Sequence, residues 1–411
     1  KVYFDHAATT PIHPRVVEAM LPYLQEQFGN PLSLHSFGEN PREAVEEARA
    51  KVADLIGAKP DEIYFTASGS EANNMAVKGI ALMNRQKGQH MVVSAIEHQS
   101  VLNATQTLEK LGFEVTQVPV DQHGLVDPDD VVAAIRDDTI LVSVMHANNE
   151  IGTIEPVAEI ARVVKERSKG IAFHTDAVAT VGNLPVDVKE LGVDLLSLAG
   201  SQFYGPKGAG ALFIRKGTRL MPLIDGGIQE RGRRAGTENV PAIVGLGVAA
   251  ELAKESLAER AERLIPLRDH LIERLTSEMD RVYLTGPSTL RQGPSTGSGR
   301  RSGLASLRTG HPTMRLPGHV SVCVEFIEGE SMLLMLNMQG IAASSGSTCT
   351  SRALKASHVL MAIGVETALA QGSLVFTLGE GNTIEDVDYV AEVLPPIVER
   401  LRQMSPLYEG N

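Results

Sequence analysis

The sequence predicts an α/β fold with a large domain, whose mostly parallel central sheet is wrapped by helices, and a small C-terminal α/β domain. The first observation is that apolar, β-branched segments such as residues 90–96 alternate with segments of helical period such as 157–167. This order is typical of parallel strands joined through helices. The second observation is size, because 411 residues of which 43% are hydrophobic can bury more than a single core.

Composition excludes several classes of function. The net charge of −12 argues against nucleic acid or an anionic membrane as the main partner. No apolar run approaches the roughly 20 residues of a membrane span, and the first residues do not resemble a signal peptide. Two cysteines, Cys323 and Cys349, are too few for a disulfide framework, so we expect a cytoplasmic protein.

The first two thirds of the chain contain most of the predicted sheet. The expected helices are one from Pro14 and those at 42–55, 98–111 and 157–167, with a loop over 28–38 and a strand, turn and helix within 62–82. Strands are expected at 90–96, 113–120, 171–178, 194–200 and 209–216, and a further strand that ends in a polar loop within 139–152. A long helix over 241–279 then leads to the second domain.

The last third is predicted to form the smaller domain. Its expected elements are strands at 319–326 and 373–378 and helices at 329–338, 351–364 and 386–404. Residues 286–318 are rich in Gly, Ser, Pro and Arg without hydrophobic period, which predicts a flexible surface insertion. We therefore expect a large domain over 13–262 and a small domain made of 1–12 and 263–411.

Polar residues follow several of the predicted strands. In sheets of this kind ligands lie at the carboxyl ends of the strands. Ser70, His98, Asn149, Asp176 and the pair Ser201 and Gln202 all fall at such ends or just beyond them. The turn before the helix near Ser70 also presents free backbone N–H groups and a positive dipole end, which suit an anion. These separate segments predict one ligand site.

Ordered motifs along nearly the whole chain resemble a known family. They are DHAATTP, FGNPLSLHSFG, FTASGSEANN, EHQSVL, MHANNEIGTIEPV, FHTDA, YGPKGAGALFIR, RGRRAGTEN, EGES, SSGSTCTS and SHVLMAIG. The chain is identified by them as a member of the cysteine desulfurases, in the class V aminotransferase group of pyridoxal-phosphate enzymes with fold type I. The resemblance implies a homodimer whose sites borrow residues across the interface.

The resemblance also assigns roles to individual positions. It implies that Asp176 pairs with the pyridinium nitrogen of the cofactor, that His98 stacks on its ring and that Asn149 neighbours the ring hydroxyl. Gly69 and Ser70 match the phosphate cradle, and Thr237 matches a phosphate contact lent by the other subunit.

Other matching positions have lost the family residue. Gln202 stands where the family has the lysine that holds the cofactor covalently, and glutamine has no nucleophilic amine. Further replacements are Ser201 for a histidine, Ala199 for a phosphate-binding serine, Ala179 for a glutamine, Val375 for the arginine that binds the substrate carboxylate, and Glu380 for a second arginine. Charge-assisted contacts contribute roughly 1.5–3 kcal/mol each. We therefore expect no pyridoxal-phosphate chemistry, and interpret Lys207 as part of a turn.

The cysteine loop of the family is retained. SSGSTCTS keeps small residues around Cys349, and Arg352 and Lys355 follow it, a positive neighbourhood that favours a reactive thiolate. Cys323 lies within an alternating strand and is expected in the core. We interpret Cys349 as the catalytic candidate, either a persulfide carrier or a thiolate ligand of a transient iron–sulfur cluster, on docking to a scaffold protein.

Two alternatives stay open from the sequence. In the first alternative, the chain is an active desulfurase that converts cysteine to alanine and a persulfide, with a displaced lysine or a non-covalently held cofactor. In the second, it is a dimeric interaction platform for a sulfur-transfer partner, which it contacts through the 286–318 insertion and the basic residues 231–234.

Overall fold

The computed structural model describes residues 1–288, 315–346, 356–406 and 408. Its central sheet has seven strands in the order β2-β8-β7-β6-β5-β3-β4. The strands are β2 (Ile63–Thr66), β3 (His90–Ser94), β4 (Glu114–Val118), β5 (Thr139–Ser143), β6 (Ala172–Asp176), β7 (Leu195–Ala199) and β8 (Gly210–Ile214). Only β8 runs antiparallel to both of its neighbours, β2 and β7. The expected α/β fold with a mostly parallel sheet is confirmed.

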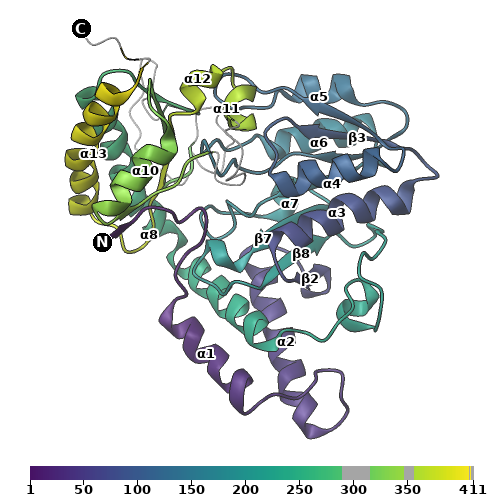
Figure 1. Cartoon of the computed structure of the whole chain (residues 1–411). Helices are drawn as coiled ribbons and strands as arrows, with labels where there is room; N and C mark the ends of the chain where they lie inside the picture. The colour runs from purple at the N-terminus through teal and green to yellow at the C-terminus, as the bar shows by residue number, and fades with distance from the viewer. Residues whose placement is uncertain (289–314, 347–355, 407, 409–411) are drawn as a thin grey trace, which may run out of the picture.

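Both faces of this sheet are covered by helices (Figure 1). Met91 and Val93 of β3 pack in one apolar cluster with residues of α3 (Gly69–Asn84) and α4 (Gln99–Glu109). Val92 points to the other face, because successive side chains of a strand alternate. It joins a cluster with residues of α2 (Ser36–Leu55), α5 (Pro128–Ala134), α6 (Val157–Arg167) and the first half of α8 (Val240–Glu278).

A second, separate core is built from the two ends of the chain. Its sheet has the order β12-β10-β9, with β9 (Val282–Leu284), β10 (His319–Val324) and β12 (Ser373–Thr377) antiparallel. The helices α10 (Gly329–Met338) and α13 (Ile384–Met404) cover it, and β1 (Val2–Tyr3) pairs with β11 (Ile341–Ala342) beside them. Val2 and Phe4 pack in this core with residues between 264 and 398. The N-terminus accordingly lies near α10 and α13 in Figure 1.

The helix α8 connects the two cores. It spans 39 residues, and its first half packs in the core of the large sheet whereas residues from Leu264 onward pack in the smaller core. The helix pair α1 (Pro14–Gln25) and α2 lies against α8, and its far end projects from the body of the molecule (Figure 1).

Several local expectations were wrong. Residues 36–38 were expected in a loop but form the first turn of α2. In the described part of the expected helix over 351–364, only α11 (His358–Ala362) is helical, because Ser357, with φ of −56° and ψ of 130°, is its N-cap. The short helices α5, α7 (Val188–Leu191) and α12 (Thr367–Ala370) and the strand β9 were not expected. No helix in the described ranges is long and apolar enough to cross a bilayer.

Candidate functional site

One large cavity collects the polar residues from the strand ends. It has a volume of about 550 Å³ and lies at the carboxyl edge of the large sheet, where the second core meets it. Six sequence-predicted residues line it: Gly69, Ser70, His98, Asn149, Asp176 and Gln202. The cavity wall also includes Ser344, Ser345 and Gly346, at the edge of the described chain before residues 347–355.

The first turn of α3 forms one end of this cavity. Ser68 is the N-cap and its hydroxyl accepts the N–H of Glu71 at 3.1 Å, while a carboxylate oxygen of Glu71 accepts the N–H of Ala67 at 3.0 Å. Gly69 packs on Val178, and a Cβ there would lie 2.5 Å from a methyl group of that valine. A helix N-terminus of this kind presents backbone N–H groups and a positive dipole end to the cavity, as an anion requires.

A chain of hydrogen bonds begins at Asp176, at the end of β6. Its carboxylate accepts the Asn73 amide at 2.6 Å and the Val178 N–H at 3.0 Å. Asn73 also donates to the Ser100 hydroxyl at 2.8 Å, which lies 2.8 Å from Nδ1 of His98. Burial raises the pKa of the Asp176 carboxyl, and the nearby His98 imidazole acts in the opposite direction.

Asn73 was not predicted as a site residue from the sequence, although its spacing from Ser70 indicates that it faces the site. It lies three residues after Ser70 in the helix α3 and therefore shares its face, toward the ends of the strands. The carboxylate of Asp176 needs such a partner, because a buried polar group without a hydrogen bond is costly.

Gln202 lies at the wall between the large cavity and a smaller one of about 60 Å³. Its amide nitrogen donates to the carbonyl oxygens of Ala7 at 3.1 Å and Ala8 at 3.4 Å. The side chain thus links the end of β7 to the N-terminal segment. Lys207 also lines the large cavity, and its ammonium donates to the carbonyl oxygen of Thr10 at 2.9 Å, as expected for a turn residue.

The positions that have lost the family residue divide into two groups. Ala179, Ala199, Ser201 and Val375 line the large cavity, so these losses concern one site. Glu380 does not line it. The Glu380 N–H donates to the Tyr204 hydroxyl at 2.7 Å, and the carboxylate lies 3.9 Å from the buried Arg260 guanidinium. The change at Glu380 therefore alters a local ion pair rather than the cavity.

The cofactor implied by the resemblance fits this cavity only in part. Asp176, His98, Asn149 and the α3 N-terminus, to which the resemblance gives the ring and the phosphate, all line the cavity. Position 202 cannot attach the cofactor covalently, because it carries an amide, whose nitrogen is hydrogen-bonded to Ala7 and Ala8. Val375 is 2% exposed and offers no charge to a substrate carboxylate. Positions 202 and 375 therefore do not fit a cofactor that is attached there and a substrate carboxylate that is bound there.

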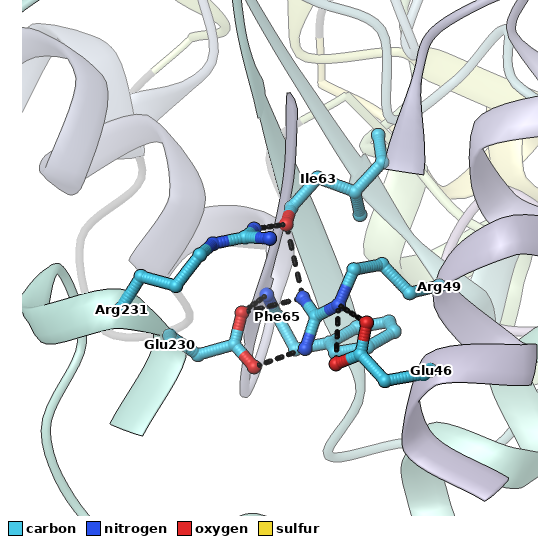
Figure 2. A network of polar contacts seen from close by, with 6 residues as sticks. All are labelled: Glu46, Arg49, Ile63, Phe65, Glu230 and Arg231. Carbon is cyan, nitrogen blue, oxygen red and sulfur yellow. Dashed lines mark hydrogen bonds and ion pairs between the residues drawn. The ribbon is translucent and has the colours of Figure 1, made fainter. Parts of the chain in front are cut away.

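Thr237 lies outside the cavity in this single chain and is exposed. Its loop is anchored by a buried network, shown in Figure 2. Glu230 accepts two bonds from the Arg49 guanidinium, at 2.8 and 2.9 Å, and one from the Phe65 N–H at 2.8 Å. Glu230 and Arg231 both have left-handed backbones, with φ of 45° and 54°. Two such residues in succession are costly unless contacts like these hold them.

The arginines of residues 231–234 are engaged within the chain. Arg231 donates to the carbonyl oxygen of Ile63 at 2.6 Å, and its guanidinium lies over the Tyr64 ring. Arg233 lies over the same ring, and Arg234 donates to Glu71 at 2.8 Å. These arginines therefore make contacts that hold the loop, and Arg231 is exposed at the same time.

Of the two cysteines, Cys323 lies in the described part of the chain and Cys349 does not. Cys323 is fully buried in β10, as expected, and burial raises the pKa of its thiol to about 12. Cys349 and most of the 286–318 insertion lie outside the described residues. Within the described ranges, no group of three or more His, Cys, Asp or Glu side chains is arranged to hold a metal ion.

Comparisons with known proteins show which family the chain is similar to. The family model described as "Aminotransferase class-V" matches residues 2–298. The chain is 53% identical over 406 residues to "Cysteine desulfurase IscS" of Methanosarcina thermophila, which covers 99% of this chain and 94% of the relative. It is 49% identical to "Cysteine desulfurase IscS 1" of Archaeoglobus fulgidus, with 99% of each chain covered.

Solved structures give the same result. A structure titled "NIFS-LIKE PROTEIN" superposes with a TM-score of 0.86 at 37% identity, covering 98% of this chain and 100% of the other. The apo structure of a cysteine desulfurase from Thermococcus onnurineus NA1 superposes with a TM-score of 0.82 at 27% identity, covering 97% and 95%.

Proposed function

The chain belongs to the class-V aminotransferase family, and from that premise we propose that it acts in sulfur transfer for iron–sulfur cluster assembly, without turning over cysteine on pyridoxal phosphate. The observation that carries the second half of the proposal is Gln202, whose amide occupies the lysine position at the cavity and is hydrogen-bonded to Ala7 and Ala8. The first half rests on the relatives, which are named cysteine desulfurases and cover nearly the whole chain.

The proposed reactive group is the thiol of Cys349. As a thiolate it attacks the terminal sulfur of a persulfide on a donor, and the donor leaves as a thiolate. One S–S bond forms as another breaks, so a neutral sulfur atom moves and no external oxidant is needed. The alternative use of the same thiolate is as one ligand of a cluster that is assembled on a partner. Cys323 does not serve either role, because it is fully buried.

The proposed partners are a second copy of this chain and a scaffold protein for iron–sulfur clusters. A second copy suits Thr237, which lies exposed on an anchored loop away from its own cavity. The scaffold would supply the remaining cysteine ligands, because the described part of the chain offers no metal-binding cluster.

The test combines a spectrum with a transfer assay. The protein, purified anaerobically, is expected to show no absorption from a covalently bound pyridoxal cofactor. In the presence of a persulfide donor, sulfur should reach the scaffold with the native chain and not with Cys349→Ser. Cys323→Ser serves as the matched control and should transfer normally. Equal transfer by Cys349→Ser and the native chain would refute the proposed role of Cys349.

A second candidate function is supported by the retained half of the cavity. Asp176, His98, Asn149 and the α3 N-terminus remain in place, as an active cysteine desulfurase with a non-covalently held cofactor would need. This function predicts that added pyridoxal phosphate makes the protein release sulfide from cysteine. The proposal made above predicts none, so one assay separates the two.

A further inference from the structure

Glu150 is a buried carboxyl group that the proposed function does not use. It follows Asn149 in the loop after β5, is 7% exposed and lines the large cavity. Its backbone is held by a tight turn, in which the Asn148 side-chain oxygen accepts the N–H groups of Glu150 and Ile151, each at 2.9 Å. The position of the carboxyl is therefore set by the large sheet.

The carboxyl contacts both sides of the segment that carries the cysteine loop. Oε2 accepts the Ser357 hydroxyl at 2.7 Å, at the start of α11. Oε1 packs so closely on Gly346 that a Cβ there would collide with the carboxyl group. Gly346 directly precedes residues 347–355, and Ser357 follows them after Ala356.

The Ser357 hydroxyl connects Glu150 to the first turn of α11 by hydrogen bonds. It donates to Glu150 and at the same time accepts the N–H groups of Val359 at 3.1 Å and Leu360 at 3.3 Å. On the other side, the Gly346 N–H donates to Ser373 at 3.3 Å, in β12. One side chain from the loop after β5 thus contacts residues that are hydrogen-bonded to α11 and to β12.

We propose that Glu150 is a positioning residue, whose carboxyl group holds Gly346 and Ser357 together at the wall of the large cavity. This inference deepens the proposed function, on which its biological meaning rests, because the joined ends belong to the segment that includes Cys349. The joining itself requires no sulfur, cofactor or partner.

The surroundings of Glu150 favour the neutral acid. Burial raises the pKa of its carboxyl to about 8, and the bond from Ser357 acts in the opposite direction. On β10, His319 contacts the Glu150 carbonyl oxygen at 3.2 Å, and the charge of Glu150 contributes to the raised pKa of the Cys323 thiol. Further titratable and charged groups on the packed elements and across the cavity include Glu97, Arg315, His358, Asp5, His98, Asp176 and Lys207.

The raised pKa of Glu150 makes the contact between the two ends depend on pH. When the two ends separate, water reaches the carboxyl and its pKa returns toward the ordinary value of 4.5. The joined state therefore binds more protons than the separated state between about 4.5 and about 8. Its stability is fully present below this window and is lost as the pH rises through it. Opening of these two ends should increase with pH by as much as about tenfold per pH unit.

Hydrogen–deuterium exchange of the described residues tests this inference. We expect the opening of amides at Gly346, Val359 and Leu360, corrected for intrinsic exchange rates, to increase at least about tenfold from about pH 5.5 to 7.5 in the native chain. In Glu150→Gln, which keeps the acceptor for Ser357 and cannot ionise, the corrected opening should not change with pH. Full pH dependence in Glu150→Gln would overturn the inference.

Glu155→Gln is the matched control. Glu155 is also fully buried, its pKa is also raised to about 8 by burial, and it accepts the Val126 N–H at 2.9 Å, away from the two ends. This variant should keep the native pH dependence at Gly346, and loss of the dependence would contradict the assignment to Glu150.

Ser357→Ala provides a second, independent variant. It removes the donor to Glu150, so exchange at Gly346 should rise at about pH 5.5 although Gly346 itself is unchanged. Unaltered exchange at Gly346 would show that the two ends are not joined through Glu150. The exchange results do not depend on sulfur transfer. A negative result in the sulfur-transfer assay would therefore contradict the proposed function without contradicting the role of Glu150.

Discussion

The residue on which the proposed loss of cofactor chemistry rests is Gln202. An amide can donate and accept hydrogen bonds, but it has no lone pair that attacks a carbonyl carbon. In this chain its nitrogen is committed to the backbone oxygens of Ala7 and Ala8, which ties the N-terminal segment to the end of β7. The side chain therefore supports the wall of a cavity in which the family places a nucleophile.

At the same scale, the buried pair of Arg49 and Glu230 is predicted to be important for stability. Glu230→Gln removes the charge that balances Arg49, whose side chain is 5% exposed. Breaking a buried ion pair in this way costs about 3–5 kcal/mol of unfolding free energy. Chemical denaturation measures the effect.

Glu46→Gln is the control for that experiment. Glu46 contacts the same guanidinium at 3.1 Å, but its side chain is 58% exposed. An exposed partner contributes about 0–1 kcal/mol, so this variant should be nearly as stable as the native chain. Equal losses in the two variants would contradict the account of the network in Figure 2.

At the scale of elements, the contact of α2 with α8 depends on a glycine. A Cβ at Gly247 would lie 2.6 Å from the Ala48 Cα, so the two helices can approach closely only without it. Gly247→Ala gains about 1 kcal/mol of helix propensity. It also forces the helices apart, and overpacking of this kind costs about 1–3 kcal/mol.

We therefore expect a net loss of stability from Gly247→Ala, measured by thermal or chemical unfolding. Glu259→Ala, at an exposed position of the same helix, is the control and should be neutral or slightly stabilising. A more stable Gly247→Ala variant would show that α2 and α8 adjust without strain.

The long elements were predictable from sequence, and the exceptions have physical reasons. The segments 157–167 and 329–338 match α6 and α10, because each has a clear helical period between breaking residues. Residues 36–38 were assigned to a loop on account of their small and polar side chains, yet tertiary packing of Gly38 and Pro41 holds them in α2. The four-residue helices α7 and α12 are too short for any period to appear.

The site was predictable where residues follow strands, and less so where it depends on other elements. Gly69, Ser70, His98, Asn149, Asp176 and Gln202 line one cavity, because the carboxyl ends of the strands share an edge. Glu380 was grouped with the lost binding residues, but the structure places it beside Arg260. Asn73 and Glu150 were missed because their partners, Asp176 and Ser357, are distant in sequence.

At the scale of the whole molecule, the end of the α1–α2 pair projects from the body (Figure 1), and residues near this end are apolar and exposed. Phe28 is 72% exposed, Leu34 99% and Phe37 63%. The rings of Phe28 and Phe37 lie 5.9 Å apart, and large exposed apolar side chains gathered in this way are typical of an interface. We expect it to be covered by a second copy of the chain, as in the homodimer implied by the family.

Phe28→Asp combined with Leu34→Asp should weaken this dimer by at least about tenfold, because two large apolar side chains lose their buried environment. Sedimentation equilibrium measures the change. Leu334→Asp is the control, since Leu334 is 69% exposed in α10, at the other end of the molecule. A dimer unaffected by the double substitution would place the interface elsewhere.

The central claim, that this chain does not use pyridoxal phosphate covalently, is tested most directly by a trapping experiment. The native chain and Gln202→Lys are incubated with the cofactor, reduced with borohydride and examined by intact mass, and sulfide release from cysteine is assayed in parallel. We predict a cofactor adduct on Gln202→Lys, because Asp176 and the α3 N-terminus remain in place, and neither adduct nor sulfide from the native chain. An adduct on a native lysine, such as Lys207, together with sulfide release would contradict the account.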